Sequence, residues 1–232
     1  MKIGLIQSRG LGDIIIALPI AKYFADRGNE VLWPIHEEFV PSFRTAAPYV
    51  EFIPIKKDVL SMYEVPLERL QSRGCERILP LYSFLGSRKD IVNERFAESF
   101  RFDEYKYAVA GVPFREKWNL QIVRDGEREQ RLFQGVVAGR DFVVCHLQGS
   151  NVRANLDVEA IAQGRSIVEI TDRTDNILDW LSVIERASLR IMIDSCFSNL
   201  TEQLRISGPK IFIRRSKMAF TPVMLGDWTF AA

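Results

Sequence analysis

The feature that most constrains the fold is the alternation of short apolar runs with helical patterns along the first half of the chain. The first apolar run covers residues 2–7, and a glycine-rich turn at 8–12 separates it from a helical pattern at 13–27. Apolar runs recur at 30–35, 50–55 and 77–81, with helical patterns at 37–47 and 67–73. Strands that alternate with helices in this way favour a parallel sheet with helices on both faces.

The same order restarts in the second half of the chain. Apolar runs at 141–147, 166–171, 189–193 and 210–213 predict strands, and helical patterns at 156–163, 176–187 and 198–206 lie between them. Before the restart, residues 89–110 predict helix with a break near Phe102, and residues 126–138 predict another helix. Both halves begin with strand, glycine turn and helix, which predicts two similar α/β lobes with a cleft between them.

We therefore divide the chain into an N-terminal lobe at 1–118 and a C-terminal lobe at 119–232. The aromatic tail with Trp228 and Phe230 is expected to pack against another part of the protein, and the N-terminal lobe is a candidate.

Composition narrows the function classes. Lys plus Arg (31) nearly balances Asp plus Glu (30), so net charge makes no case for a nucleic-acid partner, although a local basic patch would escape this count. The three cysteines form no C-x-x-C pair, which argues against a zinc site or a disulfide framework. No apolar run approaches the roughly 20 residues that cross a bilayer, and the chain enters a strand at once, so we expect a cytoplasmic protein.

Ligands of open parallel sheets bind beyond the carboxyl ends of the strands. Three segments follow an apolar strand directly and precede a helix, at 8–13, 146–151 and 194–199. In the first, Gly10 and Gly12 allow close backbone approach, and Asp13 follows them. Asp13 is either a helix-capping aspartate or a general base that binds an acceptor, and its spacing leaves both open. The segment lacks the third glycine of a dinucleotide fingerprint and the Gly-Lys of a Walker loop, which argues against NAD binding and ATP hydrolysis.

The other two segments offer polar groups suited to a nucleotide. The turn at 146–151 presents backbone N–H groups and small polar side chains that suit a phosphate or a ribose, and Arg153 lies near enough in sequence to pair with a diphosphate. A histidine at the core edge and a solvated arginine are equally simple interpretations. In the third segment Ser195 is a natural N-cap, which leaves Asp194 free to face a ligand hydroxyl.

Together these segments resemble the heptosyltransferase-like glycosyltransferases, the inverting GT-B family 9. The stretch KIGLIQSRGLGDIIIALPIAKYF is similar to that family's opening strand, Gly-Asp turn and helix with a Leu-Pro pair. HLQGSN resembles its His-Pro-Gly-Ser turn, and ERASLRIMIDSCFSNLTEQ resembles its Ala-x-Leu…Asp-Ser/Thr-Gly…His donor motif. The resemblance implies a GT-B-like α/β fold in which two Rossmann-like parallel-sheet lobes face a central cleft.

The resemblance also implies roles. Asp13 falls at the family's proposed catalytic base, in an acceptor-side loop formed by Arg9, Gly10, Leu11 and Gly12. The donor-binding residues that it implies are His146, Gln148, Gly149, Ser150, Asn151, Arg153, Asp194, Ser195, Cys196 and Asn199. The family needs no metal, so no metal or cofactor is expected beyond a nucleotide-diphosphate sugar as co-substrate. The sequence departs from the pattern at Cys196, where the family has glycine, at Asn199, where it has histidine, and at Gln148, where it has proline.

The expected function is inverting, metal-independent transfer of a sugar from a nucleotide-diphosphate sugar to a hydroxyl acceptor, in lipopolysaccharide or other surface glycan synthesis. The acceptor is a glycan, a lipid-linked molecule or another hydroxyl compound. Basic residues at Lys56, Lys57, Arg88 and Lys89 would favour peripheral membrane association, although such residues are ordinarily just solvated. Two alternatives stay open: a non-catalytic nucleotide- or sugar-binding module, and a two-lobed nucleotide-sugar epimerase.

Overall fold

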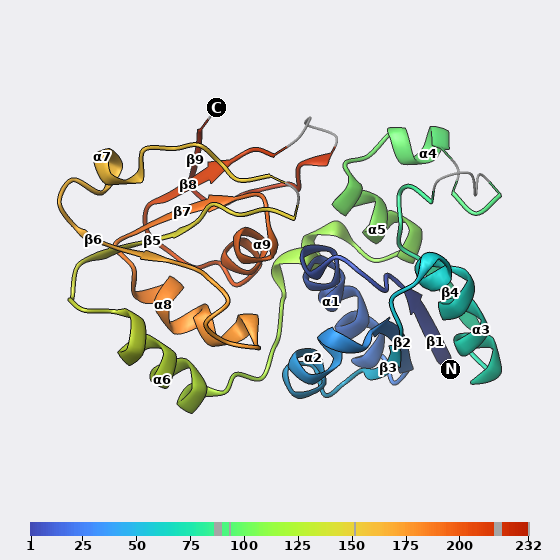
Figure 1. The fold of residues 1–232 in the computed structure, drawn as a ribbon. Coiled ribbons are helices and arrows are strands. Elements are labelled where there is room, and N and C mark those ends of the chain that lie inside the picture. Colours follow the sequence, from blue (N-terminus) through green and yellow to red (C-terminus); the bar gives the residue numbers. More distant parts are fainter. Residues whose placement is uncertain (86–89, 93, 151, 216–219, 232) are drawn as a thin grey trace. The chain divides into compact units, whose positions relative to one another are not determined.

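The fold is described from a computed structural model, which describes residues 1–85, 90–92, 94–150, 152–215 and 220–231. The chain divides into two compact units (Figure 1). The N-terminal unit comprises Met1–Val123 and Met218–Val223, and the C-terminal unit comprises Arg124–Lys217 and Met224–Ala232. The predicted basic residues Arg88 and Lys89 lie outside the described residues.

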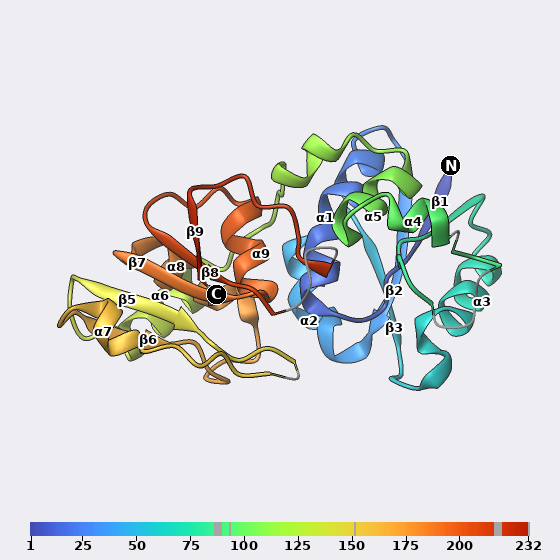
Figure 2. The same cartoon turned by 90° about the horizontal axis from the view of Figure 1, so that it is seen from above.

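The N-terminal unit contains a four-stranded parallel sheet in the order β3-β2-β1-β4. Figures 1 and 2 show α1 and α3 on opposite faces of this sheet. The described elements of the unit are β1 (Lys2–Ile6), α1 (Leu11–Ala25), β2 (Glu30–His36), η1 (Glu37–Phe39), α2 (Val40–Ala46), β3 (Glu51–Ile55), η2 (Val59–Met62), α3 (Glu64–Ser72), β4 (Arg77–Pro80), α4 (Glu94–Glu98), α5 (Phe102–Ala110) and η3 (Phe114–Trp118).

A glycine in β1 lets α3 pack closely on the sheet. A Cβ atom added at Gly4 would lie 2.7 Å from a methyl carbon of Leu70, which is fully buried in α3. Leu70 belongs to an apolar cluster with Ile6 and Leu32 from the two central strands. This packing fixes β1 against α3 and so holds the carboxyl end of β1, from which the glycine turn departs.

The C-terminal unit contains a five-stranded parallel sheet in the order β6-β5-β7-β8-β9. Figure 1 shows α7 on one face of this sheet and α6 and α8 on the other. The described elements of the unit are α6 (Gly126–Val136), β5 (Phe142–His146), α7 (Val158–Ala162), β6 (Ser166–Glu169), η4 (Ile177–Trp180), α8 (Leu181–Arg186), β7 (Leu189–Ile193), α9 (Cys196–Gln203), β8 (Lys210–Ile213) and β9 (Trp228–Ala231).

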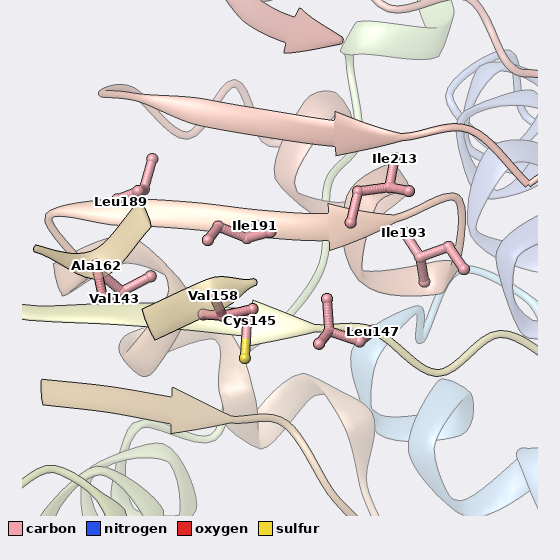
Figure 3. Packing of buried hydrophobic residues seen from close by; sticks show 9 residues of the cluster. All are labelled: Val143, Cys145, Leu147, Val158, Ala162, Leu189, Ile191, Ile193 and Ile213. Atoms are coloured by element: carbon pink, nitrogen blue, oxygen red, sulfur yellow. The ribbon is translucent and has the colours of Figure 1, made fainter. Parts of the chain in front are cut away.

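The core beneath α7 follows the period of two that strands impose. Val143 and Cys145 of β5 and Ile191 and Ile193 of β7 point to the same face and pack against Val158 of α7 (Figure 3). Both strands are buried along their whole length, as expected for central parallel strands covered on both faces. The predicted α/β class, with two Rossmann-like parallel-sheet lobes, is thereby confirmed.

The largest difference from the sequence prediction lies in the tail. The last predicted strand was 210–213, whereas residues 228–231 add a further parallel strand, β9, beside β8. Trp228 is buried in this strand and its ring packs edge-on against Phe212. Two predicted helices are also divided, because 37–47 forms η1 and α2 and 176–187 forms η4 and α8. Among the helices of the described residues, none is long and apolar enough to span a membrane.

Candidate functional site

The predicted base, Asp13, lies in the first turn of α1 and is ion-paired. Its Oδ1 atom lies 2.9 Å from Nζ of Lys106 in α5. The side chain of Asp13 is 37% exposed, whereas that of Lys106 is 2% exposed. Among the described residues, no hydrogen bond or ion pair involves Oδ2 of Asp13. One carboxylate oxygen is therefore anchored in the protein, and the other has no polar partner within the described residues.

The ammonium group of Lys106 is fully engaged inside the protein. Besides Asp13, it donates to Oε1 of Gln7 at 2.7 Å and to the carbonyl oxygen of Leu81 at 3.2 Å. The amide of Gln7 is itself oriented, because its Nε2 donates to the carbonyl oxygen of Arg9 at 2.8 Å. Three acceptors match the three protons of an ammonium group, so Lys106 keeps none for a substrate.

Gly10 makes room for the carboxylate. It precedes α1 as N-cap with φ of 81°, in the left-handed region that favours glycine. A Cβ atom added there would lie 2.6 Å from Oδ2 of Asp13. No side chain caps this end of α1, so Asp13 is not the helix cap that its spacing left open. Leu11 and Gly12 are the first two residues of the helix.

A tyrosine hydroxyl occupies the backbone donors at the carboxyl end of β1. Oη of Tyr82 accepts from the N–H of Ser8 at 3.0 Å and from that of Arg9 at 3.3 Å. Oγ of Ser8 donates to the carbonyl oxygen of Ser61, so the proton of Tyr82 is left to donate to Oγ of Ser8 at 3.0 Å. The guanidinium of Arg9 contacts Sδ of Met62. These N–H groups are thus unavailable to cradle a phosphate.

In the C-terminal unit the predicted turn after β5 folds back on itself. The N–H of Gly149 donates to the carbonyl oxygen of Val152 at 2.7 Å, and Gln148 and Arg153 form an isolated bridge. Arg153 is ion-paired with Glu169 at 2.7 Å. Oγ of Ser150 accepts from Arg215 at 2.9 Å, which brings to the turn a basic residue that was not predicted from the sequence. The predicted residue Asn151 lies outside the described residues.

His146 ends β5 and is held against the start of α9. Its Nδ1 lies 3.0 Å from Oγ of Ser195, and its ring packs edge-on against Phe197 with centroids 4.7 Å apart. Burial lowers the pKa of His146 to about 4, and the charge of Glu169 opposes this only in part. The imidazole is therefore neutral near pH 7.

The start of α9 collects the residues of the third segment. Ser195 is the N-cap, as predicted, and its N–H donates to Oγ of Ser198 at 3.0 Å. Nδ2 of Asn199 donates to the carbonyl oxygen of Ser195 at 2.9 Å, while its buried Oδ1 has no hydrogen-bond partner among the described residues. Burial raises the pKa of the Cys196 thiol to about 12. Asp194 is buried, so the side chain expected to face a ligand is only 4% exposed.

The structure thus brings together two groups of predicted residues, each within its own unit. In the N-terminal unit, Asp13 lies beside Gly10 and pairs with Lys106, which also binds Gln7, and Arg9 binds Tyr82. Lys106, Gln7 and Tyr82 were not predicted as site residues. In the C-terminal unit, His146 meets Ser195, and Gln148 meets Arg153.

Comparisons with known proteins point to one group of enzymes by fold. No protein-family model matches the sequence, and no curated protein matches it. The structure is similar to a glycosyl transferase family 9 protein from Veillonella parvula, with a TM-score of 0.63, 12% identity, and coverage of 99% of this chain and 86% of that one. It is similar to the ADP-heptose lipopolysaccharide heptosyltransferase II of E. coli, with a TM-score of 0.65, 13% identity, and coverage of 100% and 90%.

A third similar structure is the iron-containing dodecameric glycosyltransferase TibC from enterotoxigenic E. coli, with a TM-score of 0.60 and 12% identity, of which this chain covers 62%. TibC has also been solved with ADP-D-β-D-heptose, with a TM-score of 0.59 and 14% identity, and this chain covers 62% of that chain too. The resemblance to heptosyltransferase-like glycosyltransferases is confirmed at the level of the fold.

The iron of TibC corrects one expectation. We expected no metal or cofactor because the resemblance implied a family that needs none, and a protein of the same fold contains iron. Similarity to these proteins therefore does not imply a metal-free enzyme, and the expectation is wrong as an inference from the family. Within the described part of the chain, no group of three or more His, Cys, Asp or Glu side chains is placed to hold a metal.

Proposed function

We propose that the protein is a glycosyltransferase that moves a sugar from a nucleotide-diphosphate sugar to a hydroxyl acceptor, with Asp13 as the general base. The observation that carries this proposal is the asymmetric carboxylate of Asp13, in which Lys106 holds Oδ1 while Oδ2 has no partner among the described residues. The shared fold with glycosyltransferases supports the reaction class.

The proposed reaction uses Oδ2 of Asp13 as the proton acceptor. Oδ2 of Asp13 accepts the proton of the acceptor hydroxyl as that oxygen bonds to the anomeric carbon of the donor sugar. The bond from the anomeric carbon to the diphosphate breaks on the opposite face, and the nucleoside diphosphate leaves with the electron pair. Attack opposite the leaving group inverts the anomeric configuration.

The two units suit different substrates. Tyr82 occupies the N–H groups of Ser8 and Arg9, and the carboxylate of Asp13 lies beside them, so this turn suits a neutral hydroxyl better than a phosphate. We assign the acceptor to this loop, formed by Arg9, Gly10, Leu11 and Gly12.

We assign the nucleotide-sugar donor to the C-terminal unit. The buried Oδ1 of Asn199 would accept a hydrogen bond from a hydroxyl group of the nucleotide sugar. Arg215, which binds Ser150, supplies positive charge for the diphosphate. The donor set that we propose is His146, Gln148, Gly149, Ser150, Asn151, Arg153, Asp194, Ser195, Cys196 and Asn199.

The similar structures suggest which donor to test first. Because TibC binds ADP-D-β-D-heptose, an ADP-activated heptose or hexose is the first donor to test. A surface-glycan or lipopolysaccharide precursor is the first acceptor. A cytoplasmic site of action, with peripheral association to a membrane that carries a lipid-linked acceptor, belongs to the same proposal.

The test compares the wild-type protein with Asp13→Asn, which keeps the shape of the side chain but removes its basicity. Donor binding is measured by calorimetry with a panel of nucleotide sugars, and transfer and product anomeric configuration by NMR. We expect the variant to bind donor as the wild type does and to lose transfer by roughly a thousandfold, within the range for a lost general base.

Three outcomes would overturn the proposal. Near-wild-type transfer by Asp13→Asn would remove Asp13 as the base. Donor binding by the wild type without transfer or hydrolysis would indicate a binding module. Conversion of the donor sugar in the absence of acceptor would indicate an epimerase.

A further inference from the structure

We infer that Lys106 is a positioning residue for the proposed reaction: its buried ammonium fixes one oxygen of Asp13 so that the other faces the acceptor. This inference rests on the proposed function of Asp13. It concerns a residue of α5 that lies outside all three segments singled out in the sequence.

The contacts of Lys106 exclude a direct role on the substrate. Its ammonium reaches Asp13, Gln7 and the carbonyl oxygen of Leu81 at 2.9, 2.7 and 3.2 Å, which uses all three protons. The rings of Tyr82 and Phe102 lie 6.0 and 5.7 Å from the same nitrogen. A lysine that is buried and enclosed in this way acts only through its neighbours.

Asp13 needs such an anchor because its helix offers a competing partner. An acidic side chain in the first turn of a helix is attracted to the free N–H groups there. Asp13 is the acidic residue of the first turn of α1, yet no side chain caps this helix. Lys106 holds Oδ1 of Asp13, and Oδ2 lies over the N-cap residue Gly10 without capping the helix.

The same lysine ties the glycine turn to the helix that follows it. Gln7 donates to the carbonyl oxygen of Arg9 and accepts from Lys106, which in turn holds Asp13. The turn and the carboxylate are therefore positioned by one connected set of bonds. Misplacing a reacting group by about an ångström can lower the rate of a reaction by roughly a hundredfold. We expect a loss of this size when Lys106 is removed.

The test compares Lys106→Met with Lys117→Met. Lys117 is the matched control because it is a fully buried lysine of the same unit that is paired with a different aspartate, Asp103. Both variants are assayed at a temperature at which circular dichroism shows them folded. We expect Lys106→Met to lower kcat by roughly ten- to a hundredfold, with KM for the donor changed by less than about twofold.

Equal losses of kcat in the two lysine variants, or a loss in Lys106→Met that lies in KM for the donor and not in kcat, would overturn the inference.

A measurement without substrate separates this inference from the proposed function. Nitrogen-15 spectra of the lysine side chains should show a slowly exchanging ammonium signal that disappears in Lys106→Met and shifts in Asp13→Asn. An unshifted signal in Asp13→Asn would overturn the positioning role even if the wild type proves active. Absence of transfer by the wild type would instead overturn the proposed function, while the spectra still decide whether Lys106 holds the carboxylate.

Discussion

Nζ of Lys117 lies 2.6 Å from Oδ2 of Asp103, and neither side chain is exposed to solvent. The pair also holds the backbone of a distant segment, because Val223 donates its N–H to Oδ2 of Asp103 at 2.8 Å and accepts from Lys117 at its carbonyl oxygen. This pair therefore binds the returning segment 220–223 to the N-terminal unit, although the residues that follow it belong to the C-terminal unit.

Removing one partner of this pair should be strongly destabilising. Lys117→Met leaves the Asp103 carboxylate buried without its cation, which costs about 3–5 kcal/mol of unfolding free energy. Urea denaturation followed by circular dichroism measures the loss. As a control, Glu30→Gln breaks the exposed pair between Lys2 and Glu30 and should cost less than about 1 kcal/mol. Similar losses in the two variants would contradict the role assigned to the buried pair.

The substitution Gly10→Ala tests whether the space over Gly10 is needed for the carboxylate of Asp13. Gly28 provides a matched control, because its φ of 75° is close to the 81° of Gly10 but a Cβ atom added there meets nothing within 4 Å. Both alanine variants should lose about 1–2 kcal/mol of stability from backbone strain. Only Gly10→Ala should displace Oδ2 and lower transfer, by roughly tenfold or more. Equal activities in the two variants would show that the space over Gly10 is not needed.

The sequence was sufficient for features that depend on local pattern. Largely apolar runs such as 141–147 and 189–193 predicted strands of a parallel sheet, and the structure places both inside a sheet as β5 and β7. The N-cap role of Ser195 was predicted from its position between a strand and a helix, and it is confirmed.

Features that depend on distant partners were missed. Lys106 lies 99 residues from Gln7 in the chain, so its place beside the glycine turn follows from the packing of α5 and not from any local motif. For the same reason the pairing of Arg153 with Glu169, and β9 beside β8, were not predicted. A lysine between Tyr105 and Tyr107 in a helical stretch was the available signal, since a lysine among buried aromatic residues needs a partner.

The three thiols should react slowly in the folded protein. Burial raises the pKa of Cys145 to about 11 and that of Cys196 to about 12, and it also raises the pKa of Cys75. A helix N-terminus ordinarily lowers the pKa of a thiol, but at Cys196 burial has the larger effect. At pH 8 the Cys145 and Cys196 thiolates are therefore on the order of a hundredfold or more scarcer than that of a free cysteine.

Reaction with a disulfide reagent at pH 8 measures this directly. The thiols of the native protein should react much more slowly than the thiol of glutathione. In guanidinium chloride all three thiols should react rapidly. Rapid labelling that mass spectrometry assigns to Cys196 would contradict the prediction and would identify this residue as a reactive thiol beside the proposed donor site.

The pH dependence of stability should report on His146. Its pKa is lowered to about 4 in the folded protein, against 6.5 for an unperturbed histidine. Above pH 6.5 the imidazole is neutral in the folded and in the unfolded protein, so His146 does not lower the free energy of unfolding there. As the pH falls from 6.5 towards 4, the unfolded chain takes up a proton that the folded protein does not, and stability is lost, by up to roughly 3 kcal/mol from this residue.

The variant His146→Phe should remove this contribution while it keeps an aromatic ring against Phe197. Urea denaturation at several pH values between 4 and 7 gives the comparison, and the difference between variant and wild type cancels the carboxylates that titrate in both. His36, whose pKa burial also lowers, should leave a residual dependence in the variant. If the two proteins lose stability in parallel over this range, His146 takes up its proton equally in the folded and unfolded states, which contradicts the prediction.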